Sequence, residues 1–291
     1  MPASLTQTNY KEQLLAGLGR LPPFSPTLNR VLASLGREEV SFSYLAELIE
    51  KDTVLAGNIL KLVNSALYNR RAEVSSIRYA VSLLGVNKLR NAVLSMSVAR
   101  MWTTMRSPAG WSTRQFNMHS VAVAVLADLM AQRVPVVFEE GAFAAGLLHD
   151  LGRLLIATSL QDEYGNIMCR YQGDEGKLCE CERSLIGLDH AEVSTMALVS
   201  WNLPRPIRSA VRYHHAPEAD TTALTDGRTL RLSSLLAAAN EYVNYLDISV
   251  SPKNMTHDAP SPNRYLALVG DAADQVSSAF DQEFDAVKAF F

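Results

Sequence analysis

Cysteine is scarce in this sequence, with three residues among 291. Cys179 and Cys181 are separated by one residue rather than by the two of a C-x-x-C pair, and Cys169 stands apart from both. A disulfide framework needs paired cysteines and an oxidising compartment, whereas cysteine zinc sites use closely spaced pairs. We therefore expect reduced thiols in place of a disulfide framework or a cysteine zinc site.

An excess of basic residues is also missing. The chain has 27 Lys and Arg against 30 Asp and Glu, which gives a formal net charge of −3. A protein that binds DNA or RNA regardless of sequence needs a basic face. Nucleic acid is therefore not the expected partner, and a DNA-binding hypothesis has only scattered Lys and Arg in its favour.

Long apolar runs and a signal segment are absent from the sequence. The apolar run from Val121 to Met130 contains Asp128 and is about half of the roughly 20 residues that a spanning helix requires. The first residues, MPASLTQTNYKEQ, contain no apolar signal core. We expect no membrane association, a cytoplasmic location, and a buried core helix over 121–130.

Strand-like alternation of apolar and polar residues is rare, and helical spacing is common instead. Leu45, Leu48 and Ile49 recur with helical spacing, as do the apolar residues of 55–63. Asp52 and Thr53 can cap the second of these helices. The predicted fold class is all-α. Further helices are expected over 8–19, 77–84 (started by Ser75-Ser76 and ended by Gly85), 88–101, 115–131, 207–213, 230–246 and 271–291, with another that opens at 187–190 and ends at 201–204.

Polar stretches suggest how the chain is divided. Residues 105–114 (MRSPAGWSTR) form the clearest polar break in the first half, and residues 249–264 contain three prolines among small polar residues. We predict an N-terminal helical part at 1–104, a histidine-bearing helical subdomain at 112–248, a linker at 249–264 and a C-terminal helix at 265–291.

The feature around which these parts are organised is a His-Asp pair, His149-Asp150, inside the apolar stretch EGAFAAGLLHDLGRLLI (140–156). Leu151-Gly152-Arg153 is interpreted as a break before a second apolar helix. A buried polar group without a partner costs roughly 2–7 kcal/mol, so the pair needs polar neighbours. Imidazole and carboxylate are ligands for zinc, iron, manganese and nickel. The other histidines are His119, His190, His214, His215 and, in a polar stretch, His257.

The order H … HD … H … HH resembles the HD phosphohydrolase superfamily, and the N-terminal half resembles its HDOD branch, a bacterial signalling domain. The resemblance covers about residues 14–247. Its most specific parts are Asn64-Ser65-Ala66-Leu67-Tyr68 and the SLLG-x-x-x-LRN stretch. The matching stretches are Leu21-Pro22-Pro23, 45–68, 74–98, 147–155, 188–204 and Tyr213-His214-His215.

This resemblance implies a multi-helix HD-like bundle with an N-terminal helical subdomain. In HD hydrolases the ordered residues bind one or two divalent ions, here iron, manganese, zinc or nickel, which activate water to attack a phosphate. Arg153 stands where the cyclic-di-GMP phosphodiesterase branch has a lysine, and it is a candidate to hold a phosphate. The candidate metal ligands by position are His119, His149, Asp150, His190, His214, His215 and Asn240.

Two departures argue against catalysis, and no catalytic residue is assigned. The superfamily's final ligand is an aspartate, and the aligned residue here is Asn240, whose neutral amide is a poorer ligand. Asp247, seven residues later, could replace it only in another register. The phosphodiesterase branch continues after its His pair to Gly-Tyr-Pro, whereas His214-His215 is followed by Ala216-Pro217, so cyclic-di-GMP hydrolysis is not expected.

Two function hypotheses and a structural alternative stay open. The first is a regulatory protein without catalysis that acts through kinases, response regulators or cyclic-nucleotide enzymes. The second is a metal-dependent phosphohydrolase acting on a nucleotide or phosphoester. The structural alternative is that the histidines serve packing: His149 and Asp150 bonded to backbone at helix ends, His190 at a helix start, and His214-His215 as a helix cap.

Overall fold

The computed structural model describes residues 3–19, 21, 25–33, 42–65, 67–68, 73–171, 175–224, 226–250 and 266–291. The chain divides into two compact units. The predicted linker, 249–264, lies outside the described residues except for its first two, and the predicted division into four parts stays a prediction. Unit 1 consists of Met1–Pro22 with Met105–Ala273, and unit 2 of Pro23–Thr104 with Asp274–Phe291.

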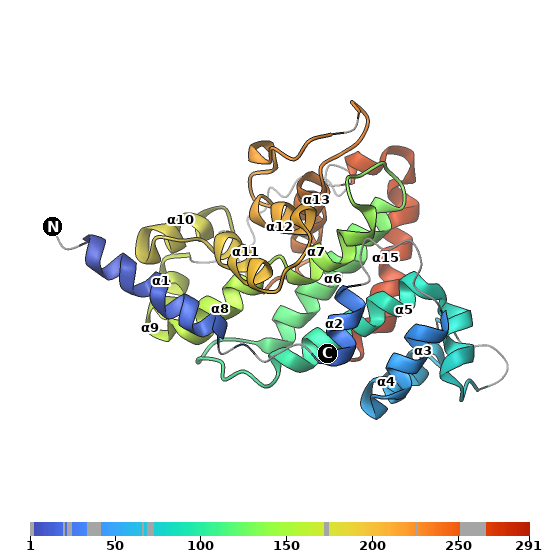
Figure 1. Cartoon of the computed structure of the whole chain (residues 1–291). Helices are drawn as coiled ribbons and strands as arrows, with labels where there is room; N and C mark the ends of the chain where they lie inside the picture. The colour runs from blue at the N-terminus through green and yellow to red at the C-terminus, as the bar shows by residue number, and fades with distance from the viewer. Residues whose placement is uncertain are drawn as a thin grey trace. The chain divides into compact units, whose positions relative to one another are not determined.

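Every regular element in the described residues is a helix, which confirms the all-α prediction (Figure 1). The extended pairing within them is limited to an isolated bridge between Val136 and Leu230. Unit 2 is built from α2 (Pro26–Leu32), α3 (Phe42–Glu50), α4 (Thr53–Val63), α5 (Ile77–Trp102) and α15 (Ala273–Lys288). Unit 1 is built from α1 (Ala3–Gly19), α6 (Thr113–Ala131), α7 (Ala142–Leu148), α8 (Leu151–Ser159), α9 (Gln161–Tyr171), α10 (Glu175–Ile186), α11 (His190–Ser200), α12 (Arg205–Arg212) and α13 (Leu232–Tyr245), with short 3-10 turns between some of them.

In unit 2, α3 and α4 both pack against α5. The helix starts follow the predicted caps: the Asp52 carboxylate accepts the backbone N–H of Leu55, and the Ser76 hydroxyl accepts that of Tyr79. Gly85, which was expected to end its helix, interrupts α5: its φ and ψ are non-helical, and two helical segments meet there. The φ of Gly85 is 76°, a left-handed conformation that favours glycine.

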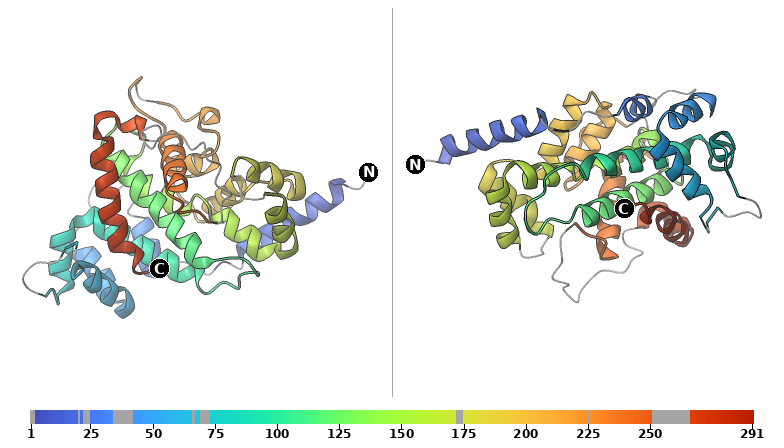
Figure 2. Two further views of the ribbon diagram at one scale, coloured as in Figure 1. Left: turned by 180° about the vertical axis from the view of Figure 1, so that it is seen from behind. Right: turned by 90° about the horizontal axis from the view of Figure 1, so that it is seen from below.

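Unit 1 has α6 at its centre, in contact with α7 and with α13, which comes more than a hundred residues later (Figure 2). Every residue of 121–130 except Asp128 is buried within α6, as predicted for a core helix. Gly146 of α7 lets the two helices approach closely, because a Cβ there would lie 2.5 Å from the Cα of Ala124. Among the described residues no single helix is long and apolar enough to cross a membrane. The two segments Glu139–Ser159 and Gln161–Tyr171 together reach the required length and apolar composition, but they are bent by 120° relative to each other.

The break in the apolar stretch lies elsewhere than predicted. Helix α7 ends at Leu148 and α8 begins at Leu151, so His149 and Asp150 form the turn between them. Gly152, interpreted as part of the break, lies inside α8. Its lack of a side chain serves packing, because a Cβ at this position would lie 1.9 Å from the backbone oxygen of His190 on α11.

Candidate metal centre

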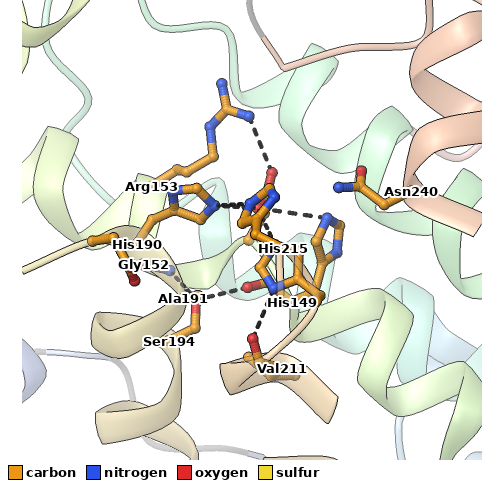
Figure 3. Close-up of polar contacts among 12 residues, drawn as sticks. His149, Gly152, Arg153, His190, Ala191, Ser194, Val211, His215 and Asn240 are labelled. Atoms are coloured by element: carbon orange, nitrogen blue, oxygen red, sulfur yellow. Dashed lines mark hydrogen bonds and ion pairs between the residues drawn. The ribbon is translucent and has the colours of Figure 1, made fainter. Parts of the chain in front are cut away.

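Five histidines and one aspartate from four segments of unit 1 converge on one place, and all of them except His215 are buried (Figure 3). Oδ1 of Asp150 lies 3.5 Å from Nε2 of His149, 3.3 Å from Nε2 of His190 and 3.8 Å from Nε2 of His214. Its other oxygen, Oδ2, lies 3.6 Å from Nε2 of His119. The structure thus brings together six of the seven predicted ligands. We call them the histidine cluster: His119 from α6, His149 and Asp150 from the α7–α8 turn, His190 from the start of α11, and His214 and His215 from the turn after α12.

In three of the buried histidines, a hydrogen bond from Nδ1 to a backbone carbonyl fixes the orientation of the ring. Nδ1 lies 2.6 Å from the Ile248 carbonyl in His119, 2.8 Å from the Gly146 carbonyl in His149 and 2.7 Å from the Val211 carbonyl in His214. A carbonyl oxygen only accepts, so Nδ1 carries the proton and Nε2 keeps its lone pair facing Asp150. This outer hydrogen bond is the arrangement typical of metal-binding histidines.

Electrostatics keep these lone pairs free of protons. Burial, with His149 beside it, lowers the pKa of His119 to about 4, and burial also lowers the pKa values of His149 and His214. Nε2 of His214 is buried and has no hydrogen-bond partner among the described residues. A buried acceptor without a partner costs free energy, which a metal ion would offset. The donor set therefore fits a divalent ion.

Asp150 supplies the negative charge at the centre. Burial by itself would raise the pKa of this carboxyl group, but His149 and Arg153 outweigh it and hold the pKa well below its ordinary value. Nη1 of Arg153 lies 3.2 Å from Oδ2 of Asp150, and Arg153 itself is buried. The predicted phosphate-binding residue therefore lies against the cluster, in contact with its carboxylate.

Glu182 on α10 is a member of the site that the sequence analysis missed. Oε2 of Glu182 accepts hydrogen bonds from the backbone N–H of His190 at 2.8 Å and from Nδ1 of His190 at 2.7 Å. Burial by itself would lower the pKa of His190, but the Glu182 carboxylate outweighs it and raises the pKa to about 9. Sγ of Cys179 lies within 4.8 Å of ligand atoms of Glu182 and His190, although both of those are already hydrogen-bonded to each other.

Ser194 on α11 holds the His-Asp turn in place and was also missed. Its hydroxyl donates to the His149 carbonyl at 2.8 Å and accepts from the Gly152 N–H at 2.7 Å (Figure 3). The side chain is fully buried. The turn between α7 and α8 therefore depends on α11, which also carries His190.

Asn240, the seventh predicted ligand, lies on α13 with its side chain directed toward the cluster (Figure 3). Its amide oxygen accepts a hydrogen bond from Asn244 at 3.1 Å, and among the described residues no hydrogen bond connects it with the histidines. Asp247, the other candidate, is exposed at the end of α13 with a φ of 60°. Asp247 is therefore no ligand in this arrangement.

Two groups of ligand atoms within the cluster are compact enough to hold a metal ion. The first ligand group is His119, His149 and Asp150, all buried. The second ligand group is Asp150, His190, His214 and His215, of which His215 is exposed. The predicted residues can thus hold metal, and Asp150 is common to both groups.

A family model described as HDOD domain matches residues 21–217. An HDOD domain protein of unknown function from Geobacter sulfurreducens has a crystal structure that covers 99% of this chain and 98% of its own, at 25% identity and a TM-score of 0.77. A candidate phosphohydrolase from Shewanella amazonensis SB2B covers 96% of this chain and 98% of its own, at 22% identity and a TM-score of 0.70, and shows the shared fold.

Two curated relatives also match. An uncharacterised protein of Treponema pallidum (strain Nichols) is 25% identical over 78% of this chain and 43% of its own length. The uncharacterised protein YuxH of Bacillus subtilis (strain 168) is 25% identical over 52% of this chain and 38% of its own length. The chain thus spans about two fifths of the length of the curated relatives it matches.

Proposed function

This chain belongs to the HDOD domain family, and from that premise we propose that it is a bacterial signal-transduction protein that regulates protein partners without turning over a substrate. The observation that carries this proposal is that the site has few carboxylate oxygens available to a metal ion. Asp150 is the sole carboxylate in the two ligand groups, and one of its oxygens is held by Arg153 at 3.2 Å. By the resemblance to HD hydrolases, Asn240 stands where they have their last aspartate, and its oxygen accepts a hydrogen bond from Asn244.

These features weigh against phosphoester hydrolysis on physical grounds. Hydrolysis needs a metal-bound water together with groups that stabilise both the attacking and the leaving oxygen, and a two-metal site does both. A neutral amide compensates less cation charge than a carboxylate does. A crystal structure from Marinobacter aquaeolei VT8, named as a candidate signal transduction protein, has the same fold at 18% identity and a TM-score of 0.71. Its name agrees with a regulatory role.

The partners we propose are kinases, response regulators or cyclic-nucleotide enzymes in the bacterial cytoplasm. The test immobilises the full chain and measures the binding of purified proteins of these three classes encoded beside its gene. We expect saturable binding to at least one of them, and equal binding by an Asp150→Asn variant. Absence of binding by all of them would contradict the proposal.

The second candidate function is a metal-dependent phosphohydrolase, which is favoured by the buried His and Asp donors next to Arg153. A screen of nucleotides and phosphodiesters with Mn²⁺, Fe²⁺ or Zn²⁺ tests it. Release of phosphate from a nucleotide, or of a phosphomonoester from a phosphodiester, that disappears in both His149→Ala and Asp150→Ala would establish hydrolysis and overturn the regulatory proposal. We expect no release above the level of these two variants.

A further inference from the structure

The number of metal ions that the cluster can accept is limited by its charge. An ion bound to Nε2 of His190 displaces the proton from that nitrogen and leaves the imidazole neutral, so the charged side chains around the ion are Asp150, Glu182 and Arg153, each at most 6% exposed. Their charges add to minus one. One divalent ion would bring the total to plus one, whereas two would bring it to plus three. Uncompensated charge in a buried place costs several kcal/mol per ion, so a single ion is favoured.

The two oxygens of Asp150 differ in what they face. Oδ2 is contacted by Arg153 at 3.2 Å and by His119 at 3.6 Å, so an ion in the first ligand group would bind an oxygen already paired with a guanidinium. Oδ1 faces Nε2 of His190 at 3.3 Å and Nε2 of His214 at 3.8 Å. The ion pair with Arg153 is thus on Oδ2, and Oδ1 is the oxygen that an ion in the second ligand group would bind.

The second group is also better equipped in donors and in access. It offers four ligand atoms against three, and four is the usual number for zinc. His190 in this group is backed by the Glu182 carboxylate, which strengthens a ligating imidazole. His215 is exposed while every member of the first group is buried, so an ion has an entry path through the second group.

We propose that the cluster binds one divalent ion, held by Asp150, His190, His214 and His215, and that the Arg153 guanidinium takes the place of a second cation on Oδ2 of Asp150. His149 does not distinguish the two groups, because its Nε2 also lies 3.5 Å from Oδ1. The distinguishing residues are His119 and His215. The metal content is independent of partner binding, so either proposal can fail without the other.

The experiment measures Zn²⁺ and Mn²⁺ bound at saturation by equilibrium dialysis and elemental analysis, with circular dichroism to verify folding. Wild type should bind one equivalent. His215→Gln should lower the affinity at least tenfold, and His119→Gln should change it less than threefold. Two equivalents in wild type, no binding at all, or a loss confined to His119→Gln would each overturn the proposal.

A gain-of-site variant keeps the proposal testable if a histidine variant fails to fold. Arg153→Gln with Asn240→Asp removes one positive charge and adds one negative charge beside the cluster. Two ions in that variant leave the same total of plus one that a single ion leaves in wild type. We expect the double variant to bind two equivalents, and to return to one when His119→Gln is added. A folded double variant that still binds one equivalent would overturn the proposed role of Arg153.

Discussion

Oε2 of Glu182 accepts two hydrogen bonds from His190, from the backbone N–H and from Nδ1 of the ring. The same oxygen therefore fixes both the first residue of α11 and the direction of its imidazole. Nε2 of His190 is left facing Asp150 at 3.3 Å and His215 at 2.8 Å. Glu182 is thus a positioning residue of the second ligand group.

The first prediction concerns this carboxylate. Glu182→Gln keeps an acceptor oxygen for Nδ1 but removes the charge that strengthens the imidazole as a ligand. We expect the Zn²⁺ affinity to fall about 10–100-fold, measured by competition with a chromophoric chelator. Glu180→Gln, exposed on the same helix, is the matched control and should bind as wild type. Equal affinities of the two variants would argue against a role for Glu182.

The second prediction concerns Gly152. A methyl group there would lie 1.9 Å from the backbone oxygen of His190, which belongs to a packed helix and has little room to move. Gly152→Ala should lower the free energy of unfolding by about 1–3 kcal/mol or more in urea denaturation. Gly165→Ala on α9 meets nothing within 4 Å and should raise it by up to about 1 kcal/mol. Similar effects of both substitutions would contradict the close approach of α8 and α11.

The third prediction concerns the hydroxyl of Ser194. Ser194→Ala removes one partner from the Gly152 N–H and one from the His149 carbonyl in a fully buried place. Buried polar groups left unpaired cost about 1–3 kcal/mol, and we expect a loss of that size in the free energy of unfolding. Ser200→Ala, exposed near the end of the same helix, should stay within about 0.5 kcal/mol. If only Ser200→Ala lowered the free energy of unfolding, the stabilising role of the Ser194 hydroxyl would be contradicted.

The fourth prediction concerns metal removal. An ion that binds the folded chain alone stabilises it, by about 2.7 kcal/mol at a free concentration one hundred times Kd. Zn²⁺ added to metal-stripped protein should therefore raise Tm, and a chelator should reverse the rise. His190→Ala, which deletes a ligand of the second group, should show no rise. A rise of equal size in that variant would place the ion elsewhere.

The fifth prediction lies in unit 2. Nδ2 of Asn64 donates to the carbonyls of Leu60 and Val74, and its Oδ1 accepts the N–H of Val74 at 2.9 Å. The amide thus ends α4 and fixes the chain just before α5. Asn64→Ala should cost about 1–3 kcal/mol in unfolding experiments, because several of these backbone groups lose their partner. Asn58→Ala within α4 should change the free energy of unfolding by no more than about 0.5 kcal/mol. A loss as large as that of Asn64→Ala would show that the hydrogen bonds of Asn64 do not stabilise the fold.

Local chemistry explains which parts of the fold could be predicted from sequence. Asp52 and Ser76 were predictable as caps because a cap hydrogen bond reaches only three residues along the chain. The all-α class followed in the same way from apolar spacing. The break at Gly85 was also predictable, because glycine readily adopts the left-handed conformation that interrupts a helix.

The candidate site could be predicted only in part, because some of its residues are brought together by tertiary packing alone. His119, His149 and Asp150 were predictable because histidine and aspartate are rare in apolar helices. Glu182 was missed because it lies in a polar helix where acidic residues are ordinary, and only tertiary packing brings it to His190. The carbonyls that hold the rings carry no sequence signal at all, because every residue has one. Ile248 is the clearest case, since its side chain gives no indication that its backbone orients His119.

The bond between His119 and Ile248 joins residues 129 positions apart. Closing so long a segment costs conformational entropy, so this bond depends on the tertiary packing that brings the two segments together. During synthesis, α6 leaves the ribosome well before the end of α13. A nascent chain that stops short of residue 248 therefore contains every histidine of the cluster and still lacks the acceptor that orients the first of them.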